Sequence, residues 1–116
     1  MHIEVTTDHN VDGSEMLTNQ IVGDAETALA RFADQLTRVE VHLADENAGK
    51  GGGADKRCKI EARPAGQQPV AVTNHGATVD DAFSGALRKL GSLLERRFGR
   101  LDLRKGGATV RRAEES

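Results

Sequence analysis

The residues best suited to chemistry in this sequence are the arginines and lysines of segment 86–105, which reads ALRKLGSLLERRFGRLDLRK. Leucines recur in it at helical spacing, and the other positions are mostly basic. Between positions 88 and 112, nine basic residues are accompanied only by Glu95 and Asp102. Such a surface attracts polyanions through their phosphate groups. The alternative is a solvated helix face, but a merely solvated helix usually interleaves both signs of charge.

The charge of the chain is segregated along its length, although the net charge is only −2. Residues 1–48 carry ten acidic and two basic residues, whereas residues 49–116 carry fourteen basic and eight acidic ones. An electrostatic dipole of this size in one small domain indicates that one surface meets a polyanion and the rest does not.

Helical geometry, at about 100° per residue, distributes the basic side chains around an apolar stripe that contains Phe83. One flank holds three of them: Lys89, Arg96 and Arg100. Arg88 falls on the opposite flank, and Arg97 falls near the apolar edge, where its stem covers the core. Small residues lie between the flanks: Gly85, Ser92 and Gly99. We expect these to let a sugar-phosphate backbone approach closely.

Aromatic residues are scarce, since the chain has three Phe and neither Tyr nor Trp. Modules that read single-stranded RNA stack bases on aromatic side chains of an exposed sheet. Phe32 and Phe83 belong to the apolar stripes of helices, so stacking on aromatics is not expected. The sequence therefore favours contacts to the backbone and shape of structured RNA.

Hydrophobic periodicity predicts six elements that position these residues. Alternation of polar and apolar residues predicts strands at 2–6, 38–45, 56–63 and 70–74. Apolar residues every three or four positions predict helices at 14–35 and 78–98. Turn-forming residues predict connections at 8–13, 46–55 and 64–69. Thr78 is a suitable N-cap, and Gly23 weakens the first helix by about 1 kcal/mol relative to Ala.

The order β-α-β-β-β-α places the chain in the α+β class. A right-handed crossover makes strands 2–6 and 38–45 parallel neighbours, and the remaining strands follow as a meander. We expect both helices to pack on one face of a four-stranded sheet, as in double-stranded RNA-binding domains, because each element has one apolar side. The other sheet face is expected to be wet. The domain is expected to span residues 1–101, with a flexible basic and polar tail at 102–116.

No set of residues has the spacing of a catalytic or metal site. His2 and His42 could face each other on neighbouring strands near Glu4 and Glu40, but a solvent-exposed sheet face explains such a grouping better than a zinc site. Cys58 lies on an apolar strand face and is expected in the core rather than as a nucleophile. We therefore expect a protein that is not an enzyme and has no metal, cofactor or small-molecule substrate.

The chain has no apolar run near the roughly 20 residues that a membrane span needs, and no signal pattern opens it. The single cysteine fits a reducing compartment. We therefore expect a cytoplasmic protein without membrane contact.

Three segments, with the helix that follows them, resemble the ribosome hibernation-promoting factor family, which includes ribosome-associated inhibitors and sigma-54 modulation proteins. They are RVEVHLADEN (38–47), DKRCKIEARP (55–64) and QQPVAVTNHGATVDDAF (67–83), followed by an LxxLLER pattern. The resemblance covers about residues 1–101, and the family fold is β-α-β-β-β-α. The family's long form adds a C-terminal dimerisation domain, so this chain resembles the short form.

The resemblance implies a translation inhibitor that binds the small (30S) ribosomal subunit at the channel for messenger and transfer RNA. Such a protein promotes ribosome hibernation in stationary phase or stress. By resemblance, five residues of the last helix would contact ribosomal RNA: Arg88, Lys89, Arg96, Arg97 and Arg100. Further candidates lie on the third strand: Lys56, Arg57, Lys59 and Arg63. We expect a monomer off the ribosome.

The first predicted helix departs from the family, whose members often carry basic residues there. Here it offers only Arg31 against Glu15, Asp24, Glu26 and Asp34. The last helix would therefore carry more of an RNA contact by itself. A second function class stays open, namely a protein–protein regulatory module that uses the acidic N-terminal half and binds no ribosome.

Overall fold

The computed structural model describes residues 1–8, 11, 14–46 and 56–106, and for residues 100–106 it describes the backbone alone. The elements are β1 (His2–Thr7), α1 (Glu15–Ala28), the 3-10 helix η1 (Ala30–Gln35), β2 (Leu36–Asp45), β3 (Lys56–Pro64), β4 (Val70–Gly76) and α2 (Val79–Gly106). The predicted α+β class and element order are confirmed. Most of the predicted loop at 46–55 and the end of the predicted tail, from 107 on, lie outside the described residues.

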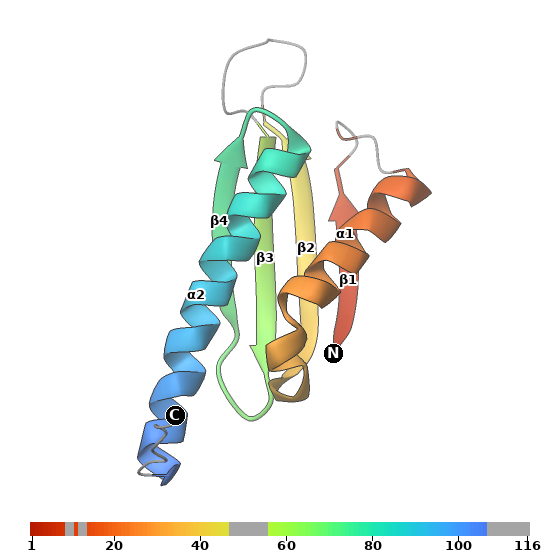
Figure 1. Cartoon of the computed structure of the whole chain (residues 1–116). Coiled ribbons are helices and arrows are strands. Elements are labelled where there is room, and N and C mark those ends of the chain that lie inside the picture. The colour runs from red at the N-terminus through yellow and green to blue at the C-terminus, as the bar shows by residue number, and fades with distance from the viewer. Residues whose placement is uncertain (9–10, 12–13, 47–55, 107–116) are drawn as a thin grey trace.

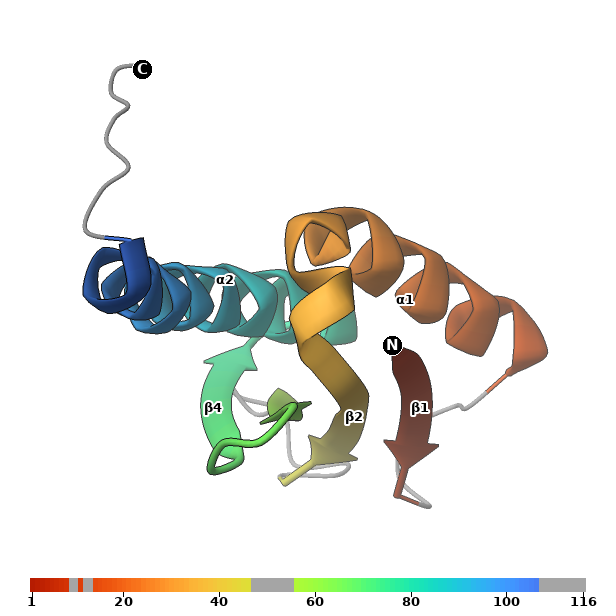
Figure 2. The same cartoon turned by 90° about the horizontal axis from the view of Figure 1, so that it is seen from below.

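The four strands form one sheet in the order β1-β2-β3-β4 (Figure 1). β1 pairs with β2 in parallel, whereas β2, β3 and β4 pair antiparallel, as the crossover and meander predict. Both helices lie on the same side of this sheet (Figure 2), with α2 over β3 and β4 and α1 over β1. One face of the sheet is therefore covered and the other is open.

The core lies between the covered face of the sheet and the two helices. From the strands, Val39, Val41, Cys58 and Ile60 are fully buried, each on the alternating positions that point toward the helices. From the helices, the fully buried side chains are Ala25, Leu29, Ala82, Ala86, Leu90 and Leu94. This layer of apolar contacts fixes how each helix is rotated, and so decides which side chains point to solvent.

The first helix ends earlier than its periodicity predicts. α1 stops at Ala28, and Leu29 caps it with a backbone N–H that bonds the Ala25 carbonyl at 2.9 Å. The chain then tightens into η1 over Ala30–Gln35, which keeps Phe32 buried at 6% exposure while turning toward β2. The apolar spacing of three or four continues through both helix types, which is why the sequence reads as one long helix.

The second helix continues past its predicted end near 98. α2 runs to Gly106 because Gly99 alone, at a penalty of about 1 kcal/mol, does not stop a helix that continues into leucines and arginines. None of the described helices is both long enough and apolar enough to cross a membrane.

Candidate functional site

Helix α2 turns its basic side chains outward because its apolar stripe packs on the sheet. The Thr78 hydroxyl accepts a hydrogen bond from the Asp81 amide at 3.0 Å and fixes the first turn. Leu90 and Leu94 are fully buried and fix the rotation of the helix about its axis. Three of the predicted basic residues are consequently exposed: Arg88, Lys89 and Arg96. Arg100 belongs to the same helix, but its side chain lies outside the described residues.

Two basic side chains of α2 reach across to the neighbouring edge of the sheet. Lys89 Nζ donates a hydrogen bond to the backbone oxygen of Thr73 at 2.8 Å. Arg97, which is half-buried, donates through Nη1 to the backbone oxygen of Gln68 at 3.0 Å. Each of these cations therefore keeps its charge at the surface while tying α2 to β4 or to the turn before it.

A hollow of about 430 Å³ lies between α2 and β4. It is lined by Val72, Arg88, Lys89, Ser92, Leu93 and Arg96. Three of the predicted RNA-binding residues thus share one concave surface. Arg88 also lines the groove on the other side of α2, so it stands on the crest of the helix rather than on a separate flank.

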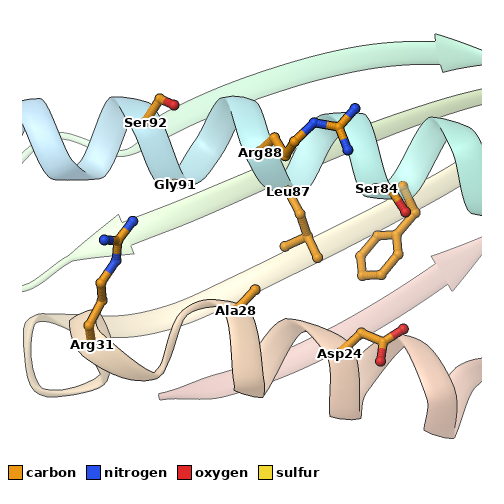
Figure 3. A pocket seen from close by; sticks show the side chains of 9 residues that line it. Asp24, Ala28, Arg31, Ser84, Leu87, Arg88, Gly91 and Ser92 are labelled. Atoms are coloured by element: carbon orange, nitrogen blue, oxygen red, sulfur yellow. The ribbon is translucent and has the colours of Figure 1, made fainter.

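A second groove, of about 500 Å³, separates α2 from α1 and η1. We call it the interhelical groove. Its apolar lining residues are Ala28, Phe83, Leu87 and Gly91. Figure 3 shows Leu87 pointing from α2 toward Ala28 of α1. The lining of the groove is therefore partly apolar.

The rim of the interhelical groove is polar and carries charges of both signs. Asp24 and Arg31 contribute from the N-terminal half, and Ser84, Arg88 and Ser92 contribute from α2. Arg31 reaches from η1 toward α2, at the opposite end of the groove from Asp24 (Figure 3). The sequence does not show that Arg31 and Arg88 line the same groove, because they are 57 positions apart and only the packing of η1 near α2 brings them to it.

Arg31 is held in place by two neighbours. Its guanidinium carbon lies 4.7 Å from the centroid of the Phe32 ring, and Phe32 in turn packs against Phe98 at 5.6 Å between centroids. Arg31 Nη1 lies 3.4 Å from Glu95 Oε2 of α2. In the sequence, Arg31 stands out only as the single basic residue of a predicted helix whose other charged residues are acidic.

The expectation that Gly85 opens the helix surface to a phosphate backbone is wrong. Gly85 is buried, and a β-carbon there would lie 2.1 Å from Asn74 Nδ2 of β4. Its small size therefore serves the packing of α2 on β4 and not a ligand. Ser92 and Gly99 are exposed, as expected, and a β-carbon at Gly99 would meet nothing within 4 Å.

The predicted residues of the third strand do not join those of α2. Arg57, Lys59 and Arg63 alternate with buried Cys58, Ile60 and Ala62, so they lie on the open face of the sheet, away from both helices. Lys56 is on the covered side at the strand end and pairs with Asp45 at 3.3 Å. The three residues on the open face therefore point away from the exposed basic residues of α2, and one flat ligand does not touch both groups. The alternation of basic and apolar residues along β3 already predicts that Arg57, Lys59 and Arg63 lie on the face opposite to the core.

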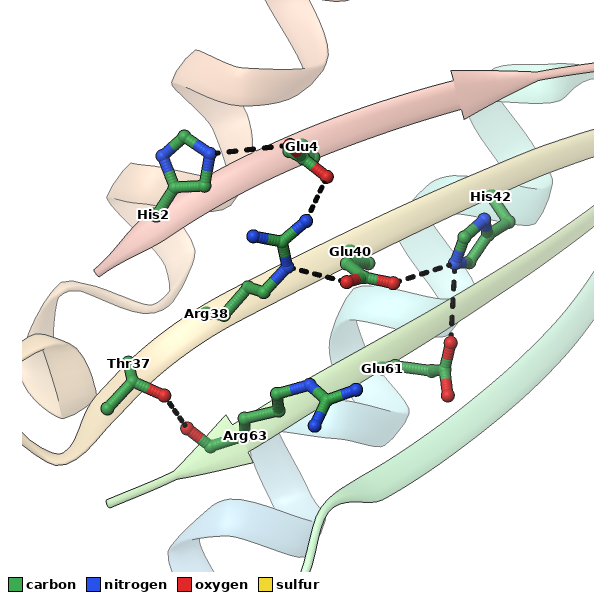
Figure 4. Close-up of polar contacts among 8 residues, drawn as sticks. All are labelled: His2, Glu4, Thr37, Arg38, Glu40, His42, Glu61 and Arg63. Carbon is green, nitrogen blue, oxygen red and sulfur yellow. Dashed lines mark hydrogen bonds and ion pairs between the residues drawn. The ribbon is translucent and has the colours of Figure 1, made fainter.

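The open face holds a chain of ion pairs that runs across β1, β2 and β3 (Figure 4). Arg38 hydrogen-bonds Glu4 and donates through Nε to Glu40 at 2.5 Å. His42 Nε2 lies 3.5 Å from Glu40 Oε1 and 3.3 Å from Glu61 Oε1. The hydrogen bond from Arg38 lowers the pKa of the Glu40 carboxyl below its ordinary value, and the same contact raises the pKa of Arg38.

The expectation that His2 faces His42 is wrong. The parallel register places His2 beside Arg38 and His42 beside Thr6, because β1 starts level with the third residue of β2. Instead, His42 gathers with Glu40 and Glu61, and their ligand atoms all lie within 4.8 Å of one another.

This group contains ligand types that bind zinc. Arg38 already engages Glu40, however, and the cross-strand pairs put Lys59 opposite His42 and Arg63 opposite Arg38. The face thus has no excess negative charge to attract a cation, and an ion-pair network accounts for its geometry.

Cys58 and the phenylalanines are in the core, as expected. Cys58 is 0% exposed, and burial raises the pKa of its thiol to about 12, which removes thiolate chemistry at neutral pH. Phe32, Phe83 and Phe98 are at most 6% exposed and are all the aromatic residues of the chain. No phenylalanine ring is therefore available at the surface for stacking a base.

Comparison with known proteins identifies the fold. The chain is similar to the Protein Y N-terminal domain of Thermus thermophilus, with a TM-score of 0.65 and 23% identity over 83% of this chain and 98% of that one. It is also similar to a ribosomal subunit interface protein from Coxiella burnetii, with a TM-score of 0.65 and 17% identity over 85% of this chain and 99% of that one. Among curated proteins no match was found.

A family model, described as sigma 54 modulation protein / S30EA ribosomal protein, matches residues 3–102. The match extends over all the strands, over α1 and over most of α2. The chain therefore belongs to the sigma 54 modulation protein / S30EA ribosomal protein family.

Proposed function

We propose that this protein inhibits translation by binding the small ribosomal subunit at the channel for messenger and transfer RNA, and so promotes ribosome hibernation in stationary phase or stress. It acts in the cytoplasm and contacts ribosomal RNA mainly through α2. The observation that carries this proposal is the gathering of Arg88, Lys89 and Arg96 around one hollow of the surface, in a family whose description names a ribosomal protein.

The charges of α2 support contact with a polyanion. Arg88 and Arg96 are exposed and form no ion pair among the described residues, so their charge is available to a ligand. Lys89 and Arg97 bond only to neutral backbone oxygens, which leaves their charge uncompensated as well. Each phosphate that such residues neutralise releases counterions and makes binding strongly dependent on salt.

The open face of the sheet is the less favourable surface. Arg38 and Arg57 are engaged with Glu4, Glu40 and Glu46 there, and Glu61 adds a further negative charge. Only Lys59 and Arg63 form no ion pair within the described part of that face. RNA would meet charges of both signs on the sheet, whereas the charged residues that line the hollow between α2 and β4 are all basic.

A pair of matched charge reversals tests the proposal and the choice of surface. The first variant is Arg88→Glu/Arg96→Glu on α2, and the second is Lys59→Glu/Arg63→Glu on β3. Each reverses two exposed charges without touching the core, so both should fold. Cosedimentation with purified 30S subunits at several salt concentrations is the measurement. The α2 variant should lose binding, and the β3 variant should keep most of it.

If the α2 variant keeps 30S binding and the β3 variant loses it, or if both variants keep it equally, the RNA contact does not lie on α2. A wild-type protein that does not sediment with ribosomes at low salt would overturn the ribosomal proposal. It would favour the second function class, a protein–protein module, for which the exposed acids of α1 offer a surface. Binding of a purified basic protein would then be the decisive measurement.

A further inference from the structure

The interhelical groove lies next to Arg88 of α2, on the side of the helix away from the hollow at β4. Its volume of about 500 Å³ lies in the range of sites that hold a small molecule or a single residue of a polymer. Its lining is partly apolar, and it also includes the charged residues Arg31, Arg88 and Asp24. This combination suits a ligand that is flat and weakly polar in one part and anionic in another.

Arg31 supplies a stacking platform that the aromatic residues of this chain do not. Its guanidinium carbon lies over the Phe32 ring, 4.7 Å from the centroid, and Glu95 contacts it from the side of α2. The side chain nevertheless remains 57% exposed. Guanidinium planes stack on nucleobases, and unstacked bases of RNA loops and bulges are bound in this way. A base entering the groove would meet a guanidinium that Phe32 and Glu95 already hold at its edge.

The other charges set where the rest of a nucleotide would lie. Glu95 offsets much of the charge of Arg31, whereas Arg88 forms no ion pair in the described part of the chain. A phosphate is therefore attracted to Arg88. Asp24, at the far end, repels a second phosphate and can accept a hydrogen bond from a ribose hydroxyl. One nucleotide fits these charges better than a continuous backbone does.

We propose that the interhelical groove holds a single unstacked nucleotide of structured RNA, with its base on the guanidinium of Arg31 and its phosphate beside Arg88. The inference rests on the proposed function, since it takes RNA as the ligand. Binding in the groove would make the protein prefer RNA with an unpaired base, whereas the rest of the basic surface recognises only the backbone and shape of the RNA.

Two hairpin RNAs test this inference directly. They differ only in whether a 2-aminopurine is bulged or paired. Fluorescence anisotropy measures affinity, and quenching of the 2-aminopurine reports stacking of that base. The wild-type protein should bind the bulged hairpin about 5-fold or more tightly than the paired one, the lower end of what a stacked base contributes. It should also quench the bulged base.

Two variants separate stacking from charge. Arg31→Lys keeps the charge but removes the plane. Gly91→Leu fills the groove and keeps every charge, and leucine is well accepted in a helix; a β-carbon at Gly91 already lies at an ordinary 3.8 Å from Arg31 Nη2. Both variants should lose the preference and the quenching. Arg96→Ala, outside the groove, should weaken both hairpins alike and keep the preference.

Equal affinity of the wild type for both hairpins, no binding of the bulged hairpin, or a preference that survives in Gly91→Leu would overturn the inference. Sedimentation with 30S subunits is measured in parallel. If the protein sediments with 30S subunits but shows no preference for the bulged hairpin, the inference about the groove is wrong and the proposed function stands. If the protein prefers the bulged hairpin but does not sediment with 30S subunits, nucleotide binding in the groove is supported and the ribosome is not the target.

Discussion

Replacing Gly85 with alanine tests whether close packing of α2 on β4 positions the basic residues of the helix. A β-carbon at Gly85 would lie 2.1 Å from Nδ2 and 2.7 Å from Cγ of Asn74. That amide donates to the backbone oxygens of Asp81 at 3.4 Å and Ala82 at 3.2 Å. The Asn74 side chain would have to move and give up these hydrogen bonds, or α2 would have to shift away from the sheet.

Three contributions set the expected change in the free energy of unfolding. Alanine favours a helix over glycine by about 1 kcal/mol. Forcing extra volume into a packed site costs about 1–3 kcal/mol, and the two long hydrogen bonds contribute about 0.5 kcal/mol each. Together these predict a destabilisation of roughly 1–3 kcal/mol. A change from glycine to alanine in an unobstructed helix position stabilises the protein instead, so the two changes in the free energy of unfolding have opposite signs.

Urea denaturation of the wild type, Gly85→Ala and a matched control measures this. The control is Gly23→Ala in α1, where the residue is exposed and a β-carbon would meet nothing within 4 Å. It should stabilise the protein by about 1 kcal/mol. Adding Asn74→Ala to Gly85→Ala should remove the clash and show a coupling of about 1 kcal/mol or more. A Gly85→Ala protein at least as stable as the wild type would refute the packing argument.

Three further predictions concern charge and reactivity. Replacing Arg88 and Arg96 with alanine should reduce the slope of log K against log salt for 30S binding by about 1.4–1.8, since each phosphate contact contributes about 0.7–0.9. Filter binding at several salt concentrations measures this slope, and an unchanged slope would contradict the prediction. The native thiol of Cys58, with its pKa of about 12, should resist DTNB at pH 8 and react only through the unfolding transition; prompt labelling would contradict its burial.

The third prediction follows from the lowered pKa of Glu40. A carboxyl with a lowered folded-state pKa adds stability above its unfolded value of 4.5 and loses it as the pH falls through the folded value. The stability difference between the wild type and Arg38→Met should therefore shrink below about pH 4.5. NMR titration should show the pKa of Glu40 rising in that variant, and an unmoved Glu40 titration would rule out Arg38 as the cause.

Local periodicity was enough to predict the elements and the inner side of each. The alternation in β2 and β3 placed Val39, Val41 and Cys58 inside, because successive strand residues point to opposite faces whatever lies around them. The apolar stripe of α2 likewise made Arg88 and Arg96 exposed. These properties depend on residues a few positions apart, so the sequence alone determines them.

What depends on residues far apart was decided only by the tertiary structure. Gly85 looked like an open position because the helix pattern cannot show that Asn74 of β4 lies against it. Arg31 looked like an isolated cation, since only the packing of η1 beside α2 brings it to the groove that Arg88 also lines. His42 met Glu61 and not His2 because strand register is set by the pairing of whole strands. The sequence determined a basic helix on an α+β domain, and helix packing decided that a groove lined by Arg31 lies next to it.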